Sequence, residues 1–173
     1  EEVANVAKKF GAEVPFLRPK KLSNHSSLVI DTVLHAFNNL PDVTDILLMQ
    51  PTSPLRRVVD INNIIELRKT FERESAASFV KVSEFPEWMF NIDKKRIRPI
   101  LGDFKKSKRR QNFEKLHMLN GSLFLSSKRH IIKNNSLLSE DTLPYLMPKE
   151  NSVDIDEELD WRYAEFLYDK IIK

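Results

Sequence analysis

Two aspartates that alternate along one segment are the clearest candidates for metal chemistry in this sequence. Asp154 and Asp156 stand in the run SVDIDEELD, and in an extended segment alternate side chains project from the same face. Two hard carboxylate oxygens on one side suit Mg²⁺, which takes one or two carboxylates together with water and substrate phosphate. The run also suits helix capping, because acidic residues favour the positive end of a helix. The two interpretations are compatible, and by pattern alone capping is favoured.

A polar loop held by two prolines follows an apolar run in the segment DILLMQPTSPLR, residues 45–56. The loop is expected to display Gln50, Ser53 and Arg56. In open α/β sheets, ligands lie beyond the carboxyl ends of the strands, which makes this loop a candidate wall of a binding site. The alternative is that proline with serine or threonine simply ends a strand. Spacing alone favours neither interpretation.

A basic run, KKSKRRQ at residues 105–111, is the third candidate. Arginine forks bind two oxygens at once, so the run could recognise phosphate or carboxylate groups. The alternative is a solvated surface loop. The run lacks the interleaved aromatics on which single-stranded nucleic acids stack, and the net charge of the chain is only +3. We therefore expect no nucleic-acid partner.

The length and composition of the chain limit the chemistry further. Its 173 residues predict one domain, residues 1–173. The absence of cysteine excludes disulfides, thiolate nucleophiles and Cys-ligated zinc. The three glycines form no phosphate-cradling loop. No apolar stretch approaches the ~18 residues that cross a bilayer, so we expect a cytoplasmic protein without a membrane partner.

Alternating helix and strand patterns fill the first half of the chain. The expected elements are a helix at 1–11, a strand at 12–19, a helix at 26–40, a strand at 45–49, a helix capped by Asp60 and a strand at 77–83. In the first helix Val3, Val6, Ala7 and Phe10 recur at helical spacing. The buried side of the second helix is predicted to hold Leu28, Val29, Val33, Ala36 and Phe37. This alternation predicts an α/β sheet with mainly parallel strands.

The alternation breaks after Ser83. Residues 87–100 are typical of a hairpin with its turn at 93–95, and residues 84–117 as a whole are predicted to be an inserted arm. After the arm the expected elements are a strand at 119–127, a helix at 128–135, a strand at 142–148 and a terminal helix at 156–172.

Five blocks of this sequence together resemble a known family. The blocks are RPKKLS at 18–23, LLMQPTSPLR at 47–56, RRQ at 109–111, NGSLFLSS at 120–127 and VDIDEELDW at 153–161. They occur in the order and approximate spacing of the acylneuraminate cytidylyltransferases, the CMP-sialic acid synthetases and the relatives that activate legionaminic and pseudaminic acids. The resemblance covers essentially the whole chain.

The resemblance implies a Rossmann-like α/β nucleotidyltransferase domain that forms a homodimer. The arm at 84–117 would be a dimerisation insertion that helps to complete the partner's site. The implied reaction transfers CMP from CTP to the anomeric hydroxyl of a nine-carbon, sialic-acid-like keto sugar acid and releases pyrophosphate. Asp154 and Asp156 would hold Mg²⁺, the implied cofactor.

The same resemblance assigns further residues. Gln50 would contact the sugar near the reacting centre, and Arg110 would help to recognise it. The residues implied on the sugar side are Gln50, Ser53, Arg110, Gln111, Asn120 and Phe124. On the nucleotide side Arg18 matches an arginine of the family, and Ser26 is expected nearby.

Three departures from the family pattern change the expectations. Family members begin with a strand and a basic, glycine-rich phosphate loop, so the chain is expected to lack roughly the first fifty residues of such a fold and to bind CTP poorly alone. Trp88 stands where sialic-acid enzymes often carry lysine, which favours a relative of sialic acid. Phe124 replaces a common tyrosine. The alternatives are a non-catalytic dimerising fragment and a cytidylyltransferase for another sugar.

Overall fold

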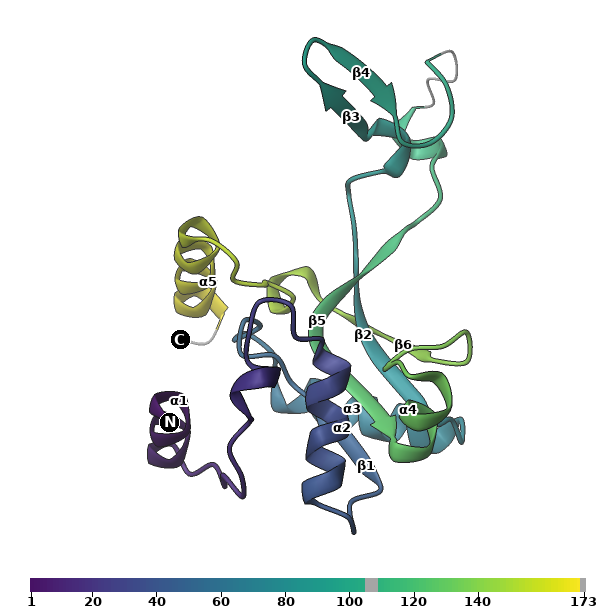
Figure 1. The fold of residues 1–173 in the computed structure, drawn as a ribbon. Helices are drawn as coiled ribbons and strands as arrows, with labels where there is room; N and C mark the ends of the chain where they lie inside the picture. The colour runs from purple at the N-terminus through teal and green to yellow at the C-terminus, as the bar shows by residue number, and fades with distance from the viewer. Residues whose placement is uncertain (105–108, 172–173) are drawn as a thin grey trace.

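The central element of the molecule is a four-stranded sheet. The computed structural model describes residues 1–104 and 109–171, except for the side chains of Arg110 and Ile171. The strands lie in the order β1 (Asp45–Leu48), β5 (His117–Ser127), β2 (Ser75–Lys81) and β6 (Leu143–Met147). Figure 1 shows helices around this sheet and a projection that extends beyond it.

Helices cover both faces of the sheet and enclose separate cores. On one face α3 (Val58–Thr70) buries Ile64 against Leu123 and Leu125 of β5. On the other face α2 (Val29–Asn39) and α4 (Lys128–Asn134) bury Val33, Phe37 and Ile131 together. Neighbouring strand residues such as Ile46 and Leu47 contact opposite cores, as the alternation of side chains along a strand requires. The predicted α/β class is confirmed.

The expected mainly parallel pairing is wrong for β5. This strand runs antiparallel to β1 and to β2, and only β2 and β6 form a parallel pair. The chain leaves the sheet at the end of β2, passes through the arm and returns along β5. A strand that returns directly beside the strand it left must run in the opposite direction, and the sheet is therefore mixed.

The segment before α2 differs most from the prediction. Residues 12–19, all of them described, form no strand, because Pro15 and Pro19 lack the backbone donors that a ladder needs. The predicted first helix forms as α1 (Glu2–Lys9), but it buries none of its side chains. Leu28, just before α2, and Val29, its first residue, are exposed rather than buried, while Val33 and Phe37 are in the core.

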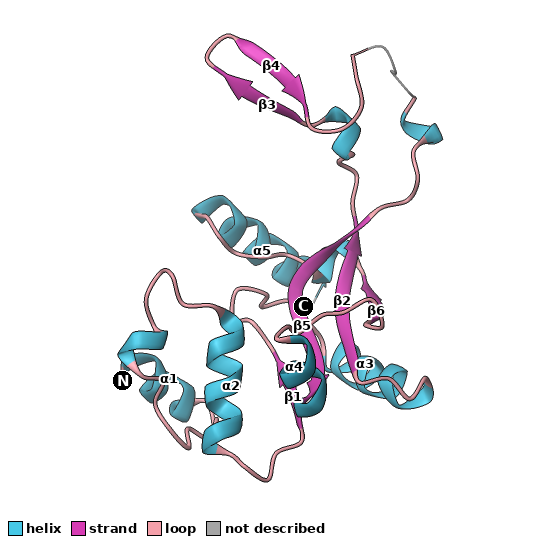
Figure 2. Ribbon diagram, turned by 45° about the vertical axis from the view of Figure 1, so that its right-hand side comes forward, coloured by secondary structure: helices cyan, strands magenta, loops and turns pink. Residues whose placement is uncertain are grey.

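The predicted arm at residues 84–117 projects away from the sheet, as Figures 1 and 2 show. Its hairpin is confirmed: β3 (Phe90–Asp93) and β4 (Arg96–Pro99) pair antiparallel across the predicted turn. At the base of the arm the rings of Phe85, Trp88 and Phe113 pack together. Large apolar side chains remain exposed along it: Trp88, Met89, Phe90, Ile92, Ile97, Ile100, Leu101 and Phe104.

The last helix, α5 (Glu158–Ile171), packs through Ala164 on Leu55 and Val153. Short 3₁₀ helices lie at Lys20–Leu22, Pro86–Trp88, Arg110–Asn112 and Lys149–Asn151. Within the described part of the chain, no helix combines the length and apolar character needed to span a bilayer. The core formed by Leu55, Val153 and Ala164 joins the loop after β1 to the segment after β6, two of the places where candidate residues lie.

Candidate functional site

The loop after β1 begins with a tight turn that Arg56 holds closed. The backbone N–H of Ser53 donates to the carbonyl of Gln50 at 3.3 Å. The Arg56 guanidinium donates to the carbonyls of Gln50 and Ser53 at 2.5 and 3.0 Å, and to the carbonyl of Ser122 in β5 at 3.2 Å. Burial lowers the pKa of Arg56 from its ordinary value, but an arginine remains charged at neutral pH. The turn is thereby tied to the sheet.

The loop does not display all the residues that the sequence predicted. Ser53 is fully buried, and its hydroxyl donates to the carbonyl of Asn120 at 3.5 Å. The expected exposure of Ser53 is therefore wrong, because the turn folds this residue inward against β5. Gln50 is half-buried, and the loop presents it at the rim of the sheet. A contact between Ser53 and a substrate stays a prediction.

Asn120 is buried in a hydrogen-bond network rather than exposed in an open pocket. Its Oδ1 accepts from the Ser78 hydroxyl at 2.5 Å and from the Ser122 N–H at 3.2 Å. Its Nδ2 donates to the Ser152 hydroxyl at 2.9 Å. These bonds join β2, β5 and the segment after β6. The predicted sugar contact of Asn120 is untested, and the network shows that this residue also supports its neighbour Gly121.

Gly121 is where the backbone of β5 meets the candidate residues. Its φ is +71°, and a Cβ placed there would lie 2.5 Å from Gln50 Oε1 and 3.6 Å from Asp154 Oδ2. Only glycine adopts this backbone region readily, and only glycine leaves room for the Gln50 amide. The side chains of Gln50 and Asp154 thus converge on one backbone position, although they stand far apart in the sequence.

The two aspartates lie on an extended segment whose side chains alternate as predicted. Val153 and Ile155 pack into the core with Leu55, whereas Asp154 and Asp156 are exposed. The Ile155 N–H donates to the Thr52 carbonyl at 2.8 Å, which fixes the segment beside the loop after β1. Both elements follow the carboxyl ends of parallel-oriented strands, β1 and β6, where ligands of open α/β sheets bind.

Helix capping, the competing interpretation of the acidic run, is carried by Asp160. Its Oδ2 accepts from the N–H groups of Asp156 and Glu157 at 3.0 and 2.9 Å. Among the described residues none hydrogen-bonds to the carboxylates of Asp154 or Asp156 or pairs with them. The two carboxylates are therefore available for a ligand.

The donor set fits a magnesium ion that shares its coordination with substrate and water. Across residues 1–104 and 109–171 no group of three or more His, Asp or Glu side chains could enclose a metal by itself. Mg²⁺ does not need one, because it commonly binds one or two carboxylates and keeps waters or phosphate oxygens. A pocket of about 220 Å³ borders Asp154 and is also lined by Lys81, Lys149 and Tyr163.

The predicted nucleotide-side residues Arg18 and Ser26 each form a hydrogen bond with a residue near them in the sequence. Arg18 Nε donates to the Ser23 hydroxyl at 3.0 Å, and Ser26 donates through its hydroxyl to Asn24 Oδ1 at 2.7 Å. Arg18 and Ser26 are both exposed. A cavity of about 820 Å³ lies between this segment and α1 and is lined by Arg18 and Lys20. Their roles in binding CTP stay predictions.

The predicted sugar-side residues Arg110 and Gln111 lie in the arm. Gln111 is exposed, and the Arg110 side chain and residues 105–108 of the basic run lie outside the described residues. Figures 1 and 2 place the described part of the arm away from β1 and the loop that follows it. Phe124 is half-buried in β5 opposite Leu48. Among the described residues, the backbone of the arm therefore lies away from Gln50.

Gly121 was absent from the predicted site, and Arg56 was predicted only as a residue displayed by the loop, whereas its guanidinium turns inward to three backbone carbonyls. Gly121 was detectable, because a glycine inside a strand pattern marks a bulge or a close backbone approach, and the β2–β5 register shifts next to it. Arg56 was visible only as a loop residue. Its three carbonyl partners lie up to 66 positions away, and no local pattern in the sequence reveals them.

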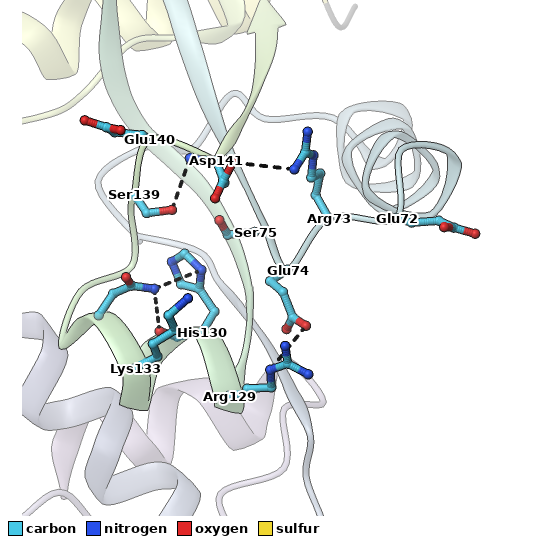
Figure 3. A pocket seen from close by; sticks show the side chains of 11 residues that line it. Glu72, Arg73, Glu74, Ser75, Arg129, His130, Lys133, Ser139, Glu140 and Asp141 are labelled. Carbon is cyan, nitrogen blue, oxygen red and sulfur yellow. Dashed lines mark hydrogen bonds and ion pairs between the residues drawn. The ribbon is translucent and has the colours of Figure 1, made fainter.

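A second polar pocket lies at the other end of the sheet and has different features. Figure 3 shows this space of about 420 Å³, which lies beside the starts of β2 and α4. Its charges are largely paired: Arg73 with Asp141 at 3.4 Å and Arg129 with Glu74 at 3.7 Å. Burial lowers the pKa of His130, which favours its neutral form. The pocket contains no residue of the candidate site.

No family model matches the chain. A CMP-N,N'-diacetyllegionaminic acid synthase of Legionella pneumophila is 35% identical over 96% of this chain and 74% of that protein. An N-acylneuraminate cytidylyltransferase of Escherichia coli is 28% identical over 95% of this chain and 39% of that protein. A post-translational flagellin modification protein B of Campylobacter coli is 27% identical over 96% of this chain.

The similarity to the Legionella protein extends over nearly the whole chain. At this identity and coverage the relationship is one of family, and the resemblance noted from the sequence blocks is confirmed. The chain belongs to the acylneuraminate cytidylyltransferase family, together with the CMP-legionaminic acid synthase that it resembles.

Proposed function

We propose that this protein transfers CMP from CTP to the anomeric hydroxyl of a sialic-acid-like nine-carbon keto sugar acid and releases pyrophosphate. The observation that carries the proposal is the convergence of Gln50 and Asp154 on the backbone of Gly121 in a chain of this family. A polar amide and a free carboxylate there face one space at the carboxyl ends of the strands, where both substrates would have to meet.

Asp154 and Asp156 would hold a magnesium ion in this proposal. The bound ion would neutralise negative charge on the CTP phosphates and on the departing pyrophosphate. Phosphoryl transfer depends mostly on positioning and charge neutralisation, and the exposed, unpaired state of the two carboxylates supports this role. The Ile155–Thr52 backbone bond keeps them beside the loop that carries Gln50.

Gln50 would orient the sugar at the reacting centre. Its side chain is half-buried, and its Oε1 lies against Gly121 on the side where Asp154 also lies. An amide offers both a donor and an acceptor to a sugar hydroxyl or carboxylate. Holding the attacking hydroxyl in line with the α-phosphate is the kind of positioning that accelerates a two-substrate reaction.

The arm would complete the site of a partner subunit in a homodimer. Its exposed apolar side chains support this, because contiguous apolar surface usually marks an interaction site. Arg110 and Gln111 would then reach the sugar in the other subunit. As for the sugar itself, the identity to the legionaminic acid enzyme and the tryptophan at position 88 favour a relative of sialic acid over sialic acid itself.

The decisive experiment supplies the full-length protein with CTP, Mg²⁺ and a panel of nonulosonic acids. We expect pyrophosphate release together with a CMP-sugar for N,N'-diacetyllegionaminic acid, with less product from N-acetylneuraminic acid. Excess EDTA should abolish both signals, and added Mg²⁺ should restore them. ATP in place of CTP is the matched control for the nucleotide.

The same assay distinguishes the alternatives. A protein that forms dimers but releases no pyrophosphate with any sugar would be a non-catalytic member of the family. Product with an eight-carbon keto sugar acid alone would keep the reaction and change the substrate. Full activity in EDTA would remove the metal from the proposal.

A further inference from the structure

We infer that Arg56 is a positioning residue for the proposed transfer, acting through Gln50. This inference rests on the proposed function, because its kinetic effect is defined for that reaction. Arg56 has no role in the proposed binding of the metal, the sugar or the nucleotide. One guanidinium contacts three carbonyls, those of Gln50, Ser53 and Ser122.

These three contacts join the two ends of the turn to the sheet. Gln50 and Ser53 are the first and last residues of the turn, and Nη2 of Arg56 donates to both carbonyls. Nη1 donates to Ser122, the residue after Gly121 in β5. Arg56 therefore fixes the backbone of Gln50 relative to the glycine against which the Gln50 side chain lies.

The position of the Gln50 side chain depends on the position of its backbone, because there is little space around the amide. A Cβ at Gly121 would come within 2.5 Å of Gln50 Oε1, so the amide lies directly against the backbone of β5. A small movement of the turn would then shift the amide relative to Asp154. Misplacement of a reacting group by about 1 Å can cost about 100-fold in rate.

The alternative is that Arg56 only stabilises the loop. Its charge has no carboxylate partner among the described residues, so an ion pair does not explain its place. Other contacts also hold the loop. Asn151 Nδ2 donates to the Leu55 carbonyl at 2.9 Å, and the Ile155 N–H donates to Thr52. Of these contacts, those of Arg56 are the ones that tie the Gln50 carbonyl to β5.

The test is a double-mutant cycle in the full-length protein with Arg56→Lys and Gln50→Ala. Lysine keeps the charge but carries a single nitrogen in place of the planar fork, so it cannot reproduce all three contacts. We expect Arg56→Lys to lower kcat by about 100-fold, with kcat/KM for the sugar falling by a similar factor. In the Gln50→Ala background the same substitution should lower kcat by less than about threefold, because coupled residues are not additive.

Arg129→Lys is the matched control, since Arg129 is an exposed arginine in α4 at the other end of the sheet. It should leave kcat unchanged. If Arg56→Lys does not fold, Arg56→Gln takes its place in the same cycle. Equal losses in kcat from Arg56→Lys with and without Gln50 would overturn the inference, because Arg56 would then act independently of Gln50.

A second readout does not depend on activity. Hydrogen exchange of the Ser53 amide, which donates to the Gln50 carbonyl, should become faster in Arg56→Lys while the β2 amides keep their protection. Unchanged exchange at Ser53 would contradict the positioning role even if the proposed reaction is confirmed. A wild-type protein without transfer activity would contradict the proposed function, and the exchange measurement would still decide whether Arg56 holds the turn.

Discussion

The loop after β1 and the arm both carry blocks typical of the family, yet the structure treats them differently. The loop, residues 50–56, is held by hydrogen bonds to β5 and to the segment after β6. The arm, residues 84–117, continues β2 and β5 away from the sheet and leaves many apolar side chains exposed. The comparison teaches that one chain by itself brings Gln50 and Asp154 together at Gly121, whereas the arm projects away from them. For the arm residues, we propose a second subunit.

The largest expected effect comes from separating these two halves by mutation. Asp154→Asn should lower turnover by about 1000-fold because it removes a carboxylate that would hold the magnesium ion, and Arg110→Ala by a similar factor because it removes a positive charge that would face the bound sugar. Mixed and reassembled, the two variants should recover about a quarter of wild-type turnover, since random pairing in a two-fold dimer leaves one intact site in half of the molecules. Pyrophosphate release measures both effects.

The control is a mixture of Arg129→Ala with Asp154→Asn. Arg129 lies outside the candidate site, so we expect each Arg129→Ala subunit to keep its own activity in this mixture. If the Asp154→Asn and Arg110→Ala mixture stays inactive although mass spectrometry shows mixed dimers, the arm serves its own chain. The contrast between the two regions would then disappear.

The next largest effect concerns the contact between β5 and the loop. Gly121→Ala should lower kcat by about 100-fold, because the new Cβ would displace the amide of Gln50. The positive φ of this residue, +71°, adds a cost of about 1–3 kcal/mol to the free energy of folding. Kinetics and urea denaturation measure the two effects separately.

Gly102→Ala is a matched control, because Gly102 also has a positive φ, of 76°, but a Cβ placed there would meet no described atom within 4 Å. It should show a similar loss of stability without the loss of kcat. Equal activity in both variants would mean that the approach of Gln50 to Gly121 has no part in the reaction.

A smaller effect is expected at the helix that follows the loop. Asp60 is buried and accepts from the Arg57 N–H and guanidinium and from the Tyr145 hydroxyl. Burial raises the pKa of Asp60, but the hydrogen bonds from Arg57 and Tyr145 outweigh it and hold the pKa below its ordinary value. Asp60→Asn should lower the free energy of unfolding at pH 7 by about 1–3 kcal/mol.

The pH dependence follows from that direction. A carboxyl whose folded pKa is lowered contributes stability above its unfolded pKa of about 3.9, and the contribution is lost as the pH falls through the lower folded value. The difference between wild type and Asp60→Asn in urea denaturation should therefore be constant from pH 6 to 8 and shrink below about pH 4. A difference that does not change with pH would contradict the role of the ionised carboxylate.

The smallest effect is expected on the arm. Ile92 is 76% exposed, and Ile92→Lys should change the free energy of unfolding of a single chain by less than about 0.5 kcal/mol. Ile64→Ala, which truncates a fully buried residue of α3, should cost about 2–5 kcal/mol. Thermal unfolding followed by circular dichroism compares the two.

Light scattering adds the oligomeric state. If the arm forms the proposed dimer interface, Ile92→Lys should weaken the dimer while its secondary structure stays intact. A dimer of unchanged affinity in this variant and in Ile97→Lys would place the interface elsewhere.

The parts of the fold that short patterns predicted are those decided by neighbouring residues. The hairpin turn at 93–95 and the strand at 119–127 follow from turn residues and β-forming side chains, and both are present. The strand predicted at 12–19 failed because Pro15 and Pro19 lack the backbone donors with which a strand pairs with its neighbour. Leu28 and Val29 fit an apolar helix face, but no element of the described structure covers them.

The sequence by itself determined the α/β class, the family blocks and the alternation that exposes Asp154 and Asp156, because each depends on residue types within a short window. Only the tertiary structure decided that β5 runs against its neighbours, that Ser53 is buried and that Gln50 lies against Gly121. The contacts responsible join residues as far apart as Arg56 and Ser122, 66 positions along the chain. Such contacts form only when strands that are distant in sequence become neighbours in the sheet.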